Sequence, residues 1–287
     1  MIGAGRFREL LRRDGMVVAP GVYDCLTAKL VERAGYDALY MTGAGTAAGL
    51  GYPDLGLLTM SEMVENAGRI AAAVDPPLVA DADTGYGNEL NVHHTVREFE
   101  ARGVAAIHIE DQEFPKRCGH LDDKRILPRE DWLAKIRAAA AARRNADFGI
   151  IARTDARAVA GFDEAVARAN AALAAGADMA FVEAPQSLEE VALVPRRVEG
   201  PCLLNVVRGG KTPEIDFAAA ARMGYKLAIV PGLLVKCVVA ICEEMLAALK
   251  SGGRHPRVPG DLTVRDLFTR LGLAEWQALE TRFRRPE

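Results

Sequence analysis

The sequence predicts an α/β fold, a (β/α)8 barrel of the TIM type, and three observations indicate it. Eight short apolar runs alternate along the chain with amphipathic stretches of helical period. Glycine follows four of these stretches, at Gly35, Gly103, Gly176 and Gly224, where it commonly ends a helix. The 287 residues, 50% of them hydrophobic, suffice for one large domain. An open doubly wound sheet rarely needs so many strand and helix units in one chain.

Each strand is predicted from a run of four or five mainly apolar residues. The predicted strands cover residues 16–19, 38–41, 78–82, 105–109, 149–152, 179–182, 202–206 and 227–230. The helices are predicted from apolar residues that recur at helical spacing, and they cover residues 25–34, 61–74, 90–102, 129–144, 163–175, 188–194, 213–223 and 233–250. With a docking helix predicted within residues 1–14, residues 1–250 make up the predicted catalytic domain.

The C-terminal residues 251–287 are predicted to form a helical extension outside the barrel. Residues 251–260 are rich in Gly and Pro and predict a linker. Two amphipathic helices are predicted after it, over residues 262–271 and 274–283. Because the barrel closes without them, we expect them to pack against a second subunit, and packing on the same subunit is the alternative.

The composition argues against several classes of function. A net charge of −3 gives no reason to expect nucleic acid or an anionic membrane as a partner. No apolar run reaches about 18 residues, so no membrane span is predicted. The five cysteines are odd in number, have no paired spacing and follow no signal peptide, which indicates the cytoplasm.

Polar groups follow nearly every predicted strand. In a barrel of this kind, the chemistry takes place where the strands end. In chain order, these ends carry Thr42 with the small residues Gly43 and Ala44, Asp81 with Asp83, Glu110, Arg153, Glu183 and Asn205. We therefore expect these residues to converge on one site.

Four acidic residues predict a magnesium site. Asp81, Asp83, Glu110 and Asp54 supply carboxylates with no His or Cys interleaved among them. Hard oxygen ligands suit Mg²⁺, with Mn²⁺ as a possible substitute, whereas zinc would require nitrogen or sulfur. The alternative is that these are solvated acids in loops. His108 lies inside a predicted strand and is expected to be an interior histidine.

The loop Lys116-Arg-Cys-Gly-His120 predicts a reactive thiol. Lys116, Arg117 and His120 surround Cys118, and nearby cations lower the pKa of a thiol. Gly119 gives the loop a flexible joint and a free backbone N–H. The alternative is an ordinary thiol in a loop.

These groups together predict the cleavage of a small carboxylate substrate. A 2-hydroxy acid bound to Mg²⁺ would lose its hydroxyl proton and break a carbon–carbon bond. The charge of the metal and of Arg153 would stabilise the resulting enolate, and Cys118 would protonate its carbon. Tyr40 is a candidate for the base.

Four motifs in this chain resemble those of the isocitrate lyase/phosphoenolpyruvate mutase superfamily. They are Lys116-Arg-Cys-Gly-His120, Asp81-x-Asp-Thr-Gly-Tyr-Gly87, His108-Ile-Glu-Asp-Gln112 and Ala152-Arg-Thr-Asp155. The resemblance extends over residues 16 to 250. It implies an α/β barrel with a C-terminal helix exchanged between subunits, a homotetramer and dependence on Mg²⁺.

The resemblance also implies a role for each site residue. Asp81 would contact the metal directly, whereas Asp54, Asp83 and Glu110 would act largely through water. Thr42, Gly43 and Ala44 would hold the 2-oxo acid portion beside Tyr40. Cys118 would be the proton donor on a closing loop, and the residues lining the substrate would be Arg153, Glu183, Asn205, Gly119 and His120.

The choice of reaction within the superfamily depends on two loops. The thiol loop favours a carbon–carbon lyase over a phosphonomutase. Val206 and Val207 follow Asn205 and cannot donate side-chain hydrogen bonds to an additional carboxylate, and residues 209–213 (Gly-Gly-Lys-Thr-Pro) resemble those of 2-alkylmalate lyases. We therefore expect cleavage of a branched 2-hydroxydicarboxylate such as 2,3-dimethylmalate into pyruvate and propionate.

Other reactions remain open at this point. They are cleavage of the tricarboxylate 2-methylisocitrate into pyruvate and succinate, hydrolysis of oxaloacetate and phosphonomutase chemistry. A metabolite-binding protein without catalytic activity is a further alternative.

Overall fold

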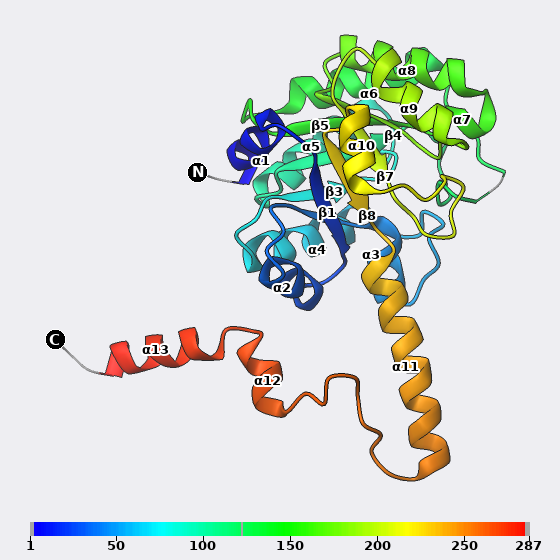
Figure 1. The fold of residues 1–287 in the computed structure, drawn as a ribbon. Coiled ribbons are helices and arrows are strands. Elements are labelled where there is room, and N and C mark those ends of the chain that lie inside the picture. Colours follow the sequence, from blue (N-terminus) through cyan, green and yellow to red (C-terminus); the bar gives the residue numbers. More distant parts are fainter. Residues whose placement is uncertain (1–2, 122, 285–287) are drawn as a thin grey trace.

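The strands close into one parallel barrel, in chain order, in a computed structural model that describes residues 3–121 and 123–284 (Figure 1). The strands are β1 Val17–Val22, β2 Leu39–Met41, β3 Leu78–Asp81, β4 Ala106–Glu110, β5 Gly149–Thr154, β6 Met179–Val182, β7 Cys202–Asn205 and β8 Leu227–Val230. β8 pairs with β1, with Val17 opposite Leu227, and this pairing closes the ring. The predicted barrel is confirmed, and each predicted strand overlaps an observed one.

A helix follows each strand, and most of these helices cover the outside of the barrel (Figure 1). The helices are α2 Cys25–Arg33, α4 Met60–Ala73, α5 Glu89–Ala101, α6 Arg129–Ala142, α8 Phe162–Ala174, α9 Leu188–Arg197, α10 Phe217–Met223 and α11 Leu233–Gly252. α10 begins at Phe217 rather than at the predicted residue 213. The reason is a cap at Asp216, whose side chain accepts a hydrogen bond from the N–H of Ala219.

The apolar pattern does not predict two short helices, α3 Gly43–Gly49 and α7 Ala156–Val159. α3 contains only Gly, Ala and Thr, so it lacks the large apolar side chains that would reveal a helical period. Thr42 caps α3, because its side chain accepts a hydrogen bond from the N–H of Gly45. Each short helix starts directly after a strand, β2 or β5, and therefore lies at the C-terminal end of the barrel.

The opposite end of the barrel is closed by α1 Gly3–Arg12. Phe7 of α1 is 1% exposed and belongs to the core cluster that fills the barrel, together with Tyr40 and Phe181. Full burial of such a side chain contributes about 1.5–3 kcal/mol relative to leaving it in water. The barrel interior is therefore a packed core, and its polar groups lie toward the C-terminal ends of the strands.

The C-terminal helices extend away from the barrel (Figure 1). None of the residues of α11 is buried within the described structure. α12 Val264–Thr269 and α13 Leu273–Arg284 overlap the two predicted helices, and they expose large apolar side chains such as Phe268 and Trp276. α11 includes residues 251 and 252, so the segment between α11 and α12 starts two residues later than the predicted linker.

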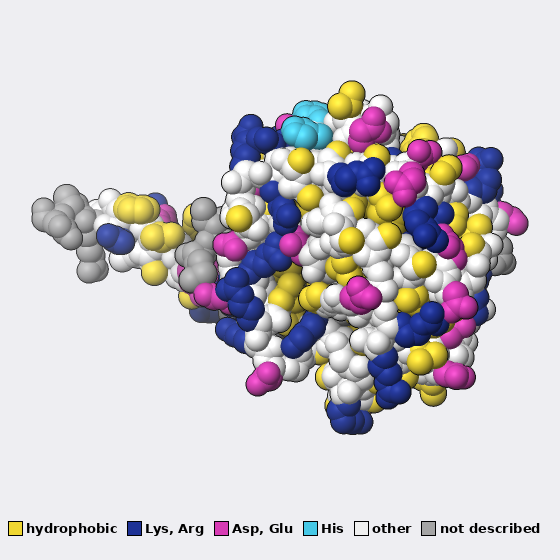
Figure 2. Space-filling view, turned by 90° about the horizontal axis from the view of Figure 1, so that it is seen from above, with side chains coloured by type: hydrophobic (Ala, Val, Ile, Leu, Met, Phe, Trp, Pro, Cys, Tyr) yellow, Lys and Arg dark blue, Asp and Glu magenta, His cyan; other side chains and the backbone are white. Residues whose placement is uncertain are grey.

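The surface carries charges of both signs. Acidic and basic side chains are interspersed over the face shown in Figure 2. Among the described residues, no helix combines the length and apolar character that crossing a membrane requires.

Candidate active site

A cavity of about 190 Å³ opens at the C-terminal ends of the strands. It gathers most of the predicted site residues: Tyr40, Thr42, Ala44, Asp54, Asp81, Cys118, Gly119, His120, Arg153, Glu183 and Asn205. The other three predicted residues, Gly43, Asp83 and Glu110, do not line the cavity themselves but contact residues that do. The backbone N–H groups of Gly43 and Asp83 donate to Asp81, at 3.1 and 3.0 Å, and Glu110 Oε2 lies 3.1 Å from Arg153.

Asp81 is the centre of a buried hydrogen-bond network at the floor of the cavity. The Tyr40 hydroxyl lies 3.3 Å from Asp81 Oδ2 and 2.8 Å from Nε2 of His108. A side chain at Gly43 would place its Cβ 2.5 Å from Asp81 Oδ2, so only glycine lets the backbone of α3 approach the carboxylate. His108 is a buried histidine, as predicted, but sequence reasoning missed that it contacts two residues of the site.

The protonation states on this floor follow from burial and from two cations. Burial lowers the pKa of His108 to about 4, so its ring is neutral at pH 7. Burial alone would raise the pKa of Asp81, but the positive charges around it hold that pKa well below its usual range. Because His108 is neutral at pH 7, Lys116 and Arg153 supply this charge, and Asp81 is ionised.

Lys116 occupies a position that the sequence did not predict. Its side chain is buried, and its Nζ forms ion pairs with Asp54 and, at 2.8 Å, with Asp83. Burial raises the pKa of Asp83 to about 6, against the attraction of Lys116. Lys116 therefore neutralises the acidic group and does not act on the thiol two residues away.

The acidic residues fit a hard divalent cation in their donor chemistry. All four supply oxygen, and Glu110 is fully buried with an Oε1 atom that accepts no hydrogen bond from the described residues. Burial also raises the pKa of Glu110 well above its usual value, against the attraction of Arg153 and Lys116. In the described part of the chain, no three acidic, His or Cys side chains converge as direct ligands. An ion such as Mg²⁺ keeps several waters and uses one or two protein carboxylates.

Arg153 is a fixed buried cation beside the cavity. It forms ion pairs with Glu110, with Asp155 at 2.9 Å and with Glu183 at 3.7 Å. Its guanidinium also lies over the ring of Phe181, 5.3 Å from the centroid. Burial alone would lower the pKa of Arg153, but the surrounding carboxylates hold it well above its usual value. The cavity therefore presents a permanent positive charge to an anionic substrate.

His120, Glu183 and Asn205 form a second network at the rim. The backbone N–H of Lys211 donates to His120 Nδ1 at 3.1 Å, so the ring proton of neutral His120 lies on Nε2. That nitrogen is 3.2 Å from Glu183, which also accepts a hydrogen bond from Asn205 at 3.1 Å. Burial lowers the pKa of His120 and favours the neutral ring. Neutral His120 and Asn205 are therefore hydrogen-bond donors at the cavity.

The thiol of Cys118 lines the cavity, but the prediction about its pKa is wrong. Burial raises the pKa of Cys118, and the hydrogen bond from the His120 backbone offsets only part of this effect. Lys116 points to the acidic residues, and the half-exposed Arg117 lies 3.9 Å from Asp123. Neither cation is therefore available to stabilise a thiolate. The thiol keeps its proton at neutral pH, as a proton donor requires.

One wall of the cavity is largely apolar, and the sequence did not predict that its residues lie together. It consists of Val207, Pro231, Gly232, Val235 and Lys236. Val235 and Lys236 belong to α11, which follows β8 and lies beside the loop after β7 because β7 and β8 pair directly. No local sequence signal marks these residues as neighbours of Asp81.

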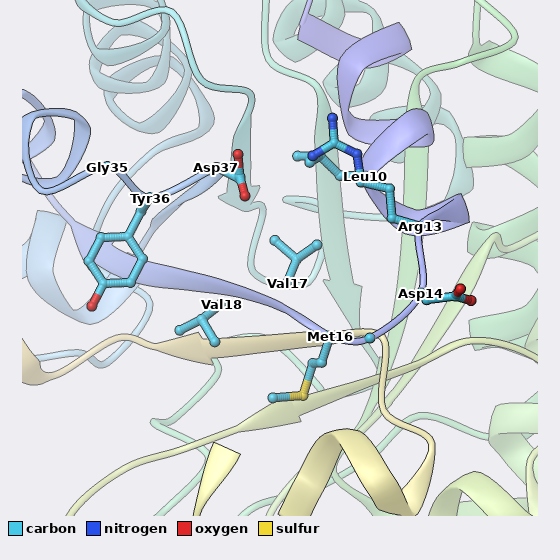
Figure 3. Close-up of a pocket in the computed structure, with 10 residues that line it drawn as sticks. Leu10, Arg13, Asp14, Met16, Val17, Val18, Gly35, Tyr36 and Asp37 are labelled. Atoms are coloured by element: carbon cyan, nitrogen blue, oxygen red, sulfur yellow. The ribbon is translucent and has the colours of Figure 1, made fainter. Parts of the chain in front are cut away.

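A second cavity, of about 280 Å³, lies at the opposite end of the barrel (Figure 3). It is formed by the end of α1, the start of β1 and the turn before β2. Its charged side chains, Arg13, Asp14 and Asp37, are exposed. In barrels of this type the end where strands begin serves stability rather than chemistry, so we assign the active site to the cavity that contains Asp81 and Arg153.

Comparisons with known proteins identify the family of this chain. A sequence model of the phosphoenolpyruvate phosphomutase family matches residues 7–250. The chain is 47% identical to a 2,3-dimethylmalate lyase of Eubacterium barkeri, over 86% of each chain. It is 45% identical to a 2-methylisocitrate lyase of Aeropyrum pernix, over 91% of this chain and 84% of that protein.

Solved structures show the same relationship. A 2,3-dimethylmalate lyase superposes with a TM-score of 0.93 at 41% identity, covering 98% of this chain and 95% of that one. An oxaloacetate acetylhydrolase bound to 3,3-difluorooxalacetate gives 0.93 at 39% identity, over 97% and 96%. A phosphonopyruvate hydrolase in complex with oxalate and Mg²⁺ gives 0.89 at 31% identity, over 99% and 100%. The chain therefore belongs to the phosphoenolpyruvate mutase/isocitrate lyase superfamily of lyases and mutases.

Proposed function

We propose that this enzyme is a Mg²⁺-dependent carbon–carbon lyase that cleaves a branched 2-hydroxydicarboxylate, with 2,3-dimethylmalate as the nominal substrate and pyruvate and propionate as products. The observation that carries the proposal is the partly buried, protonated thiol of Cys118 in the same cavity as Asp81 and Arg153. A phosphonomutase needs no such proton donor, whereas a lyase must protonate the carbon left behind by bond cleavage.

The charged residues would bind the two ends of the substrate. Mg²⁺, held by Asp81 directly and by Asp54, Asp83 and Glu110 through water, would supply Lewis acidity and offset the negative charge that develops during cleavage. Thr42, Gly43 and Ala44 at the start of α3 would hold the 2-oxo acid portion beside Tyr40. Arg153, His120 and Asn205 would hold the other carboxylate, which becomes the enolate half.

Proton transfers would involve two residues on opposite sides of the bond that breaks. The Tyr40 hydroxyl, in contact with His108 and Asp81, is the candidate that receives the proton of the substrate hydroxyl. Cys118 would donate its proton to the carbon of the departing half, and the adjacent Gly119 allows the backbone to lie close to that half.

The apolar wall supports a dicarboxylate with alkyl substituents. Val207, Pro231 and Val235 have side chains that cannot pair with a further carboxylate, so burial of methyl groups against them is favourable. One observation favours 2-methylisocitrate as a second candidate. Lys236 also lines the cavity, and its ammonium, 2.8 Å from the carbonyl oxygen of Arg208, could be redirected to a third carboxylate.

We further propose that the enzyme is a homotetramer in which C-terminal helices are exchanged between subunits. The exposed apolar side chains of α11, α12 and α13 support this assembly, because monomeric proteins rarely leave so many together in water. Sedimentation or light scattering would give the mass in solution, and a monomer at micromolar concentration would contradict the proposal.

A substrate panel tests the reaction. The protein is incubated with Mg²⁺ and either 2,3-dimethylmalate, other 2-alkylmalates or 2-methylisocitrate, and pyruvate is measured with lactate dehydrogenase. Oxaloacetate is tested for release of oxalate, and phosphonopyruvate is followed by phosphorus NMR. We expect the highest kcat/KM for 2,3-dimethylmalate. Release of no pyruvate from any member of the panel would contradict lyase activity.

A further inference from the structure

We propose that Lys124 is a positioning residue that holds the thiol of Cys118 in the cavity by tying its loop to the carboxylate that also holds Arg153. The kinetic part of this inference rests on the proposed lyase function, whereas its structural part does not. No motif in the sequence pointed to Lys124.

The contacts of Lys124 are buried and lie on the C-terminal side of the thiol. Its side chain is 2% exposed, and its Nζ donates a hydrogen bond to the carbonyl oxygen of Gly119, the residue after Cys118. The same Nζ forms an ion pair with Asp155 Oδ1 at 2.7 Å. The loop also turns on itself here, because the N–H of Leu121 donates to the carbonyl oxygen of Cys118 at 2.9 Å.

Asp155 connects Lys124 to the substrate-binding cation. Its Oδ1 accepts from Lys124 and lies 3.3 Å from Nη2 of Arg153, and its Oδ2 accepts from Nε of Arg153 at 2.9 Å. Asp155 is fixed in turn by its own backbone N–H, which donates to Asp111 at 2.8 Å. One rigid carboxylate therefore orients both the loop with the proton donor and the guanidinium that faces the substrate.

Tight packing of the loop against Arg153 explains why this anchor matters. A Cβ on Gly119 would lie 2.5 Å from Nη2 of Arg153 and 2.7 Å from Cγ of Glu183. The backbone at Gly119, next to the thiol, therefore packs directly against the side chains of Arg153 and Glu183. A displacement of about 1 Å at a reacting group is enough to lower a rate substantially, so a fixed loop is needed for proton transfer.

The two sides of the thiol are held in different ways. On the N-terminal side, the Gln112 side chain binds both the N–H and the carbonyl oxygen of Arg117, at 3.0 and 2.8 Å, and Lys116 pairs with the acidic residues. On the C-terminal side, Lys124 binds the loop backbone at Gly119, whereas the next residue, His120, is held through its side chain by Lys211 and Glu183. Loss of Lys124 should free Gly119 and Cys118 while residues 112–117 stay in place.

Hydrogen exchange of the intact protein, with Mg²⁺ and without substrate, tests the structural part. In Lys124→Met, the amide of Leu121 should exchange about tenfold faster or more, because its acceptor is no longer fixed, while amides of β4 to β7 keep their protection. Lys124→Arg should restore part of the protection, since a guanidinium can still bind a carboxylate and a carbonyl. Lys29→Met, which removes a lysine of α2 paired with Glu32, is the matched control and should change nothing in this loop.

Unchanged exchange of the Leu121 amide in Lys124→Met would overturn the proposal. If Lys124→Met fails to fold, Lys124→Gln, with a smaller polar side chain, is tested instead. The Leu121 amide should again exchange about tenfold faster or more. Because no substrate is used, these readouts hold even if the protein proves not to be a lyase.

A double-mutant cycle tests whether Lys124 acts through the thiol. Lys124→Met should lower kcat about tenfold or more in the parent enzyme but have little further effect in a Cys118→Ser background, since the positioned group is already gone. If the loss of kcat in the double variant equals the product of the losses in the two single variants, Lys124 acts independently of the thiol. That result would overturn the positioning role.

Discussion

The two ends of the barrel differ in how deeply the charged side chains around their cavities are buried. The cavity at the base measures about 280 Å³ and has Arg13, Asp14 and Asp37 exposed around it (Figure 3). The cavity at the rim measures about 190 Å³, but its charged side chains, among them Asp81 and Arg153, are buried. Exposed charges are stabilised by water, whereas buried charges are costly unless they are paired.

The comparison teaches that buried, paired charge distinguishes the candidate functional end of the barrel from its base. At the rim, several carboxylates surround two buried cations, Arg153 and Lys116, and the pKa values of these groups are displaced by burial and by their neighbours. Such an arrangement costs stability and is typical of sites that bind or transform ligands. Substitutions at the two ends should therefore have very different effects.

The largest effect is expected for Arg153→Met. Removal of this guanidinium leaves Glu110, Asp155 and Glu183 buried with reduced compensation, and breaking buried ion pairs in this way costs about 3–5 kcal/mol. Activity should be lost as well, because the substrate carboxylate loses its partner. Chemical denaturation measures the first effect and the pyruvate assay the second. A variant as stable as the parent would show that the rim is not held together by this cation.

Cys118→Ser should separate catalysis from stability at the same end. The hydroxyl of serine is a much weaker acid than a thiol, so turnover should fall by roughly two or more orders of magnitude, the scale expected for removal of a positioned acid. The affinity for Mg²⁺ and the unfolding transition should stay nearly unchanged, because a serine is close to a cysteine in size and the neutral thiol carries no charge that an ion pair would need. Steady-state kinetics measure the turnover, and calorimetry measures the affinity for Mg²⁺ and the unfolding transition. If Cys118→Ser turns over as fast as the parent, the thiol takes no part in the mechanism.

Asp81→Ala should weaken the binding of metal and substrate together. Asp81 is the carboxylate that the network at the floor of the cavity keeps ionised, and the substrate is expected to bind partly through the ion. We expect an increase of about tenfold or more in both dissociation constants. Calorimetric titration with Mg²⁺, and then with oxalate as a substrate-like ligand, measures both; unchanged values would rule out Asp81 as the main ligand.

The thiol should show the pH dependence of a buried group. Because burial raises the pKa of Cys118, its proton stays bound to a higher pH than on an exposed thiol, so alkylation of Cys118 should be slow near neutral pH and rise only at more alkaline pH. Peptide-resolved alkylation with iodoacetamide across a pH series checks this. Faster alkylation of Cys118 than of free cysteine at pH 7 would restore the low-pKa interpretation.

The sequence was sufficient to predict which residues meet at the rim. Once eight strands close into a barrel, residues that follow different strands, such as Asp81, Arg153 and Asn205, must come together at one end, whatever their separation along the chain. The loop that contains Cys118 was singled out by its basic neighbours and by its resemblance to a superfamily motif. The strand-end residues needed only the strand periodicity and the chain order.

The sequence could not predict where long side chains point. Lys116 is adjacent to the thiol loop in sequence, but its ammonium pairs with Asp54, 62 residues away, and so the predicted effect on the thiol had the wrong sign. Lys124 and Asp155 are likewise partners only in the folded chain. Ion pairs of this kind depend on the tertiary arrangement of the loops, and no local pattern records them.

The smallest effect is expected at the base of the barrel, and it completes the comparison. Arg13→Ala removes an exposed side chain whose charge is already solvated, so the free energy of unfolding should change by no more than about 0.5 kcal/mol. Turnover should equal that of the parent, because the base lies at the opposite end of the barrel from Asp81 and Cys118. Chemical denaturation and the pyruvate assay measure both quantities. A loss of activity in Arg13→Ala with unchanged stability would mean that the larger cavity takes part in function, and buried charge would then no longer distinguish the two ends.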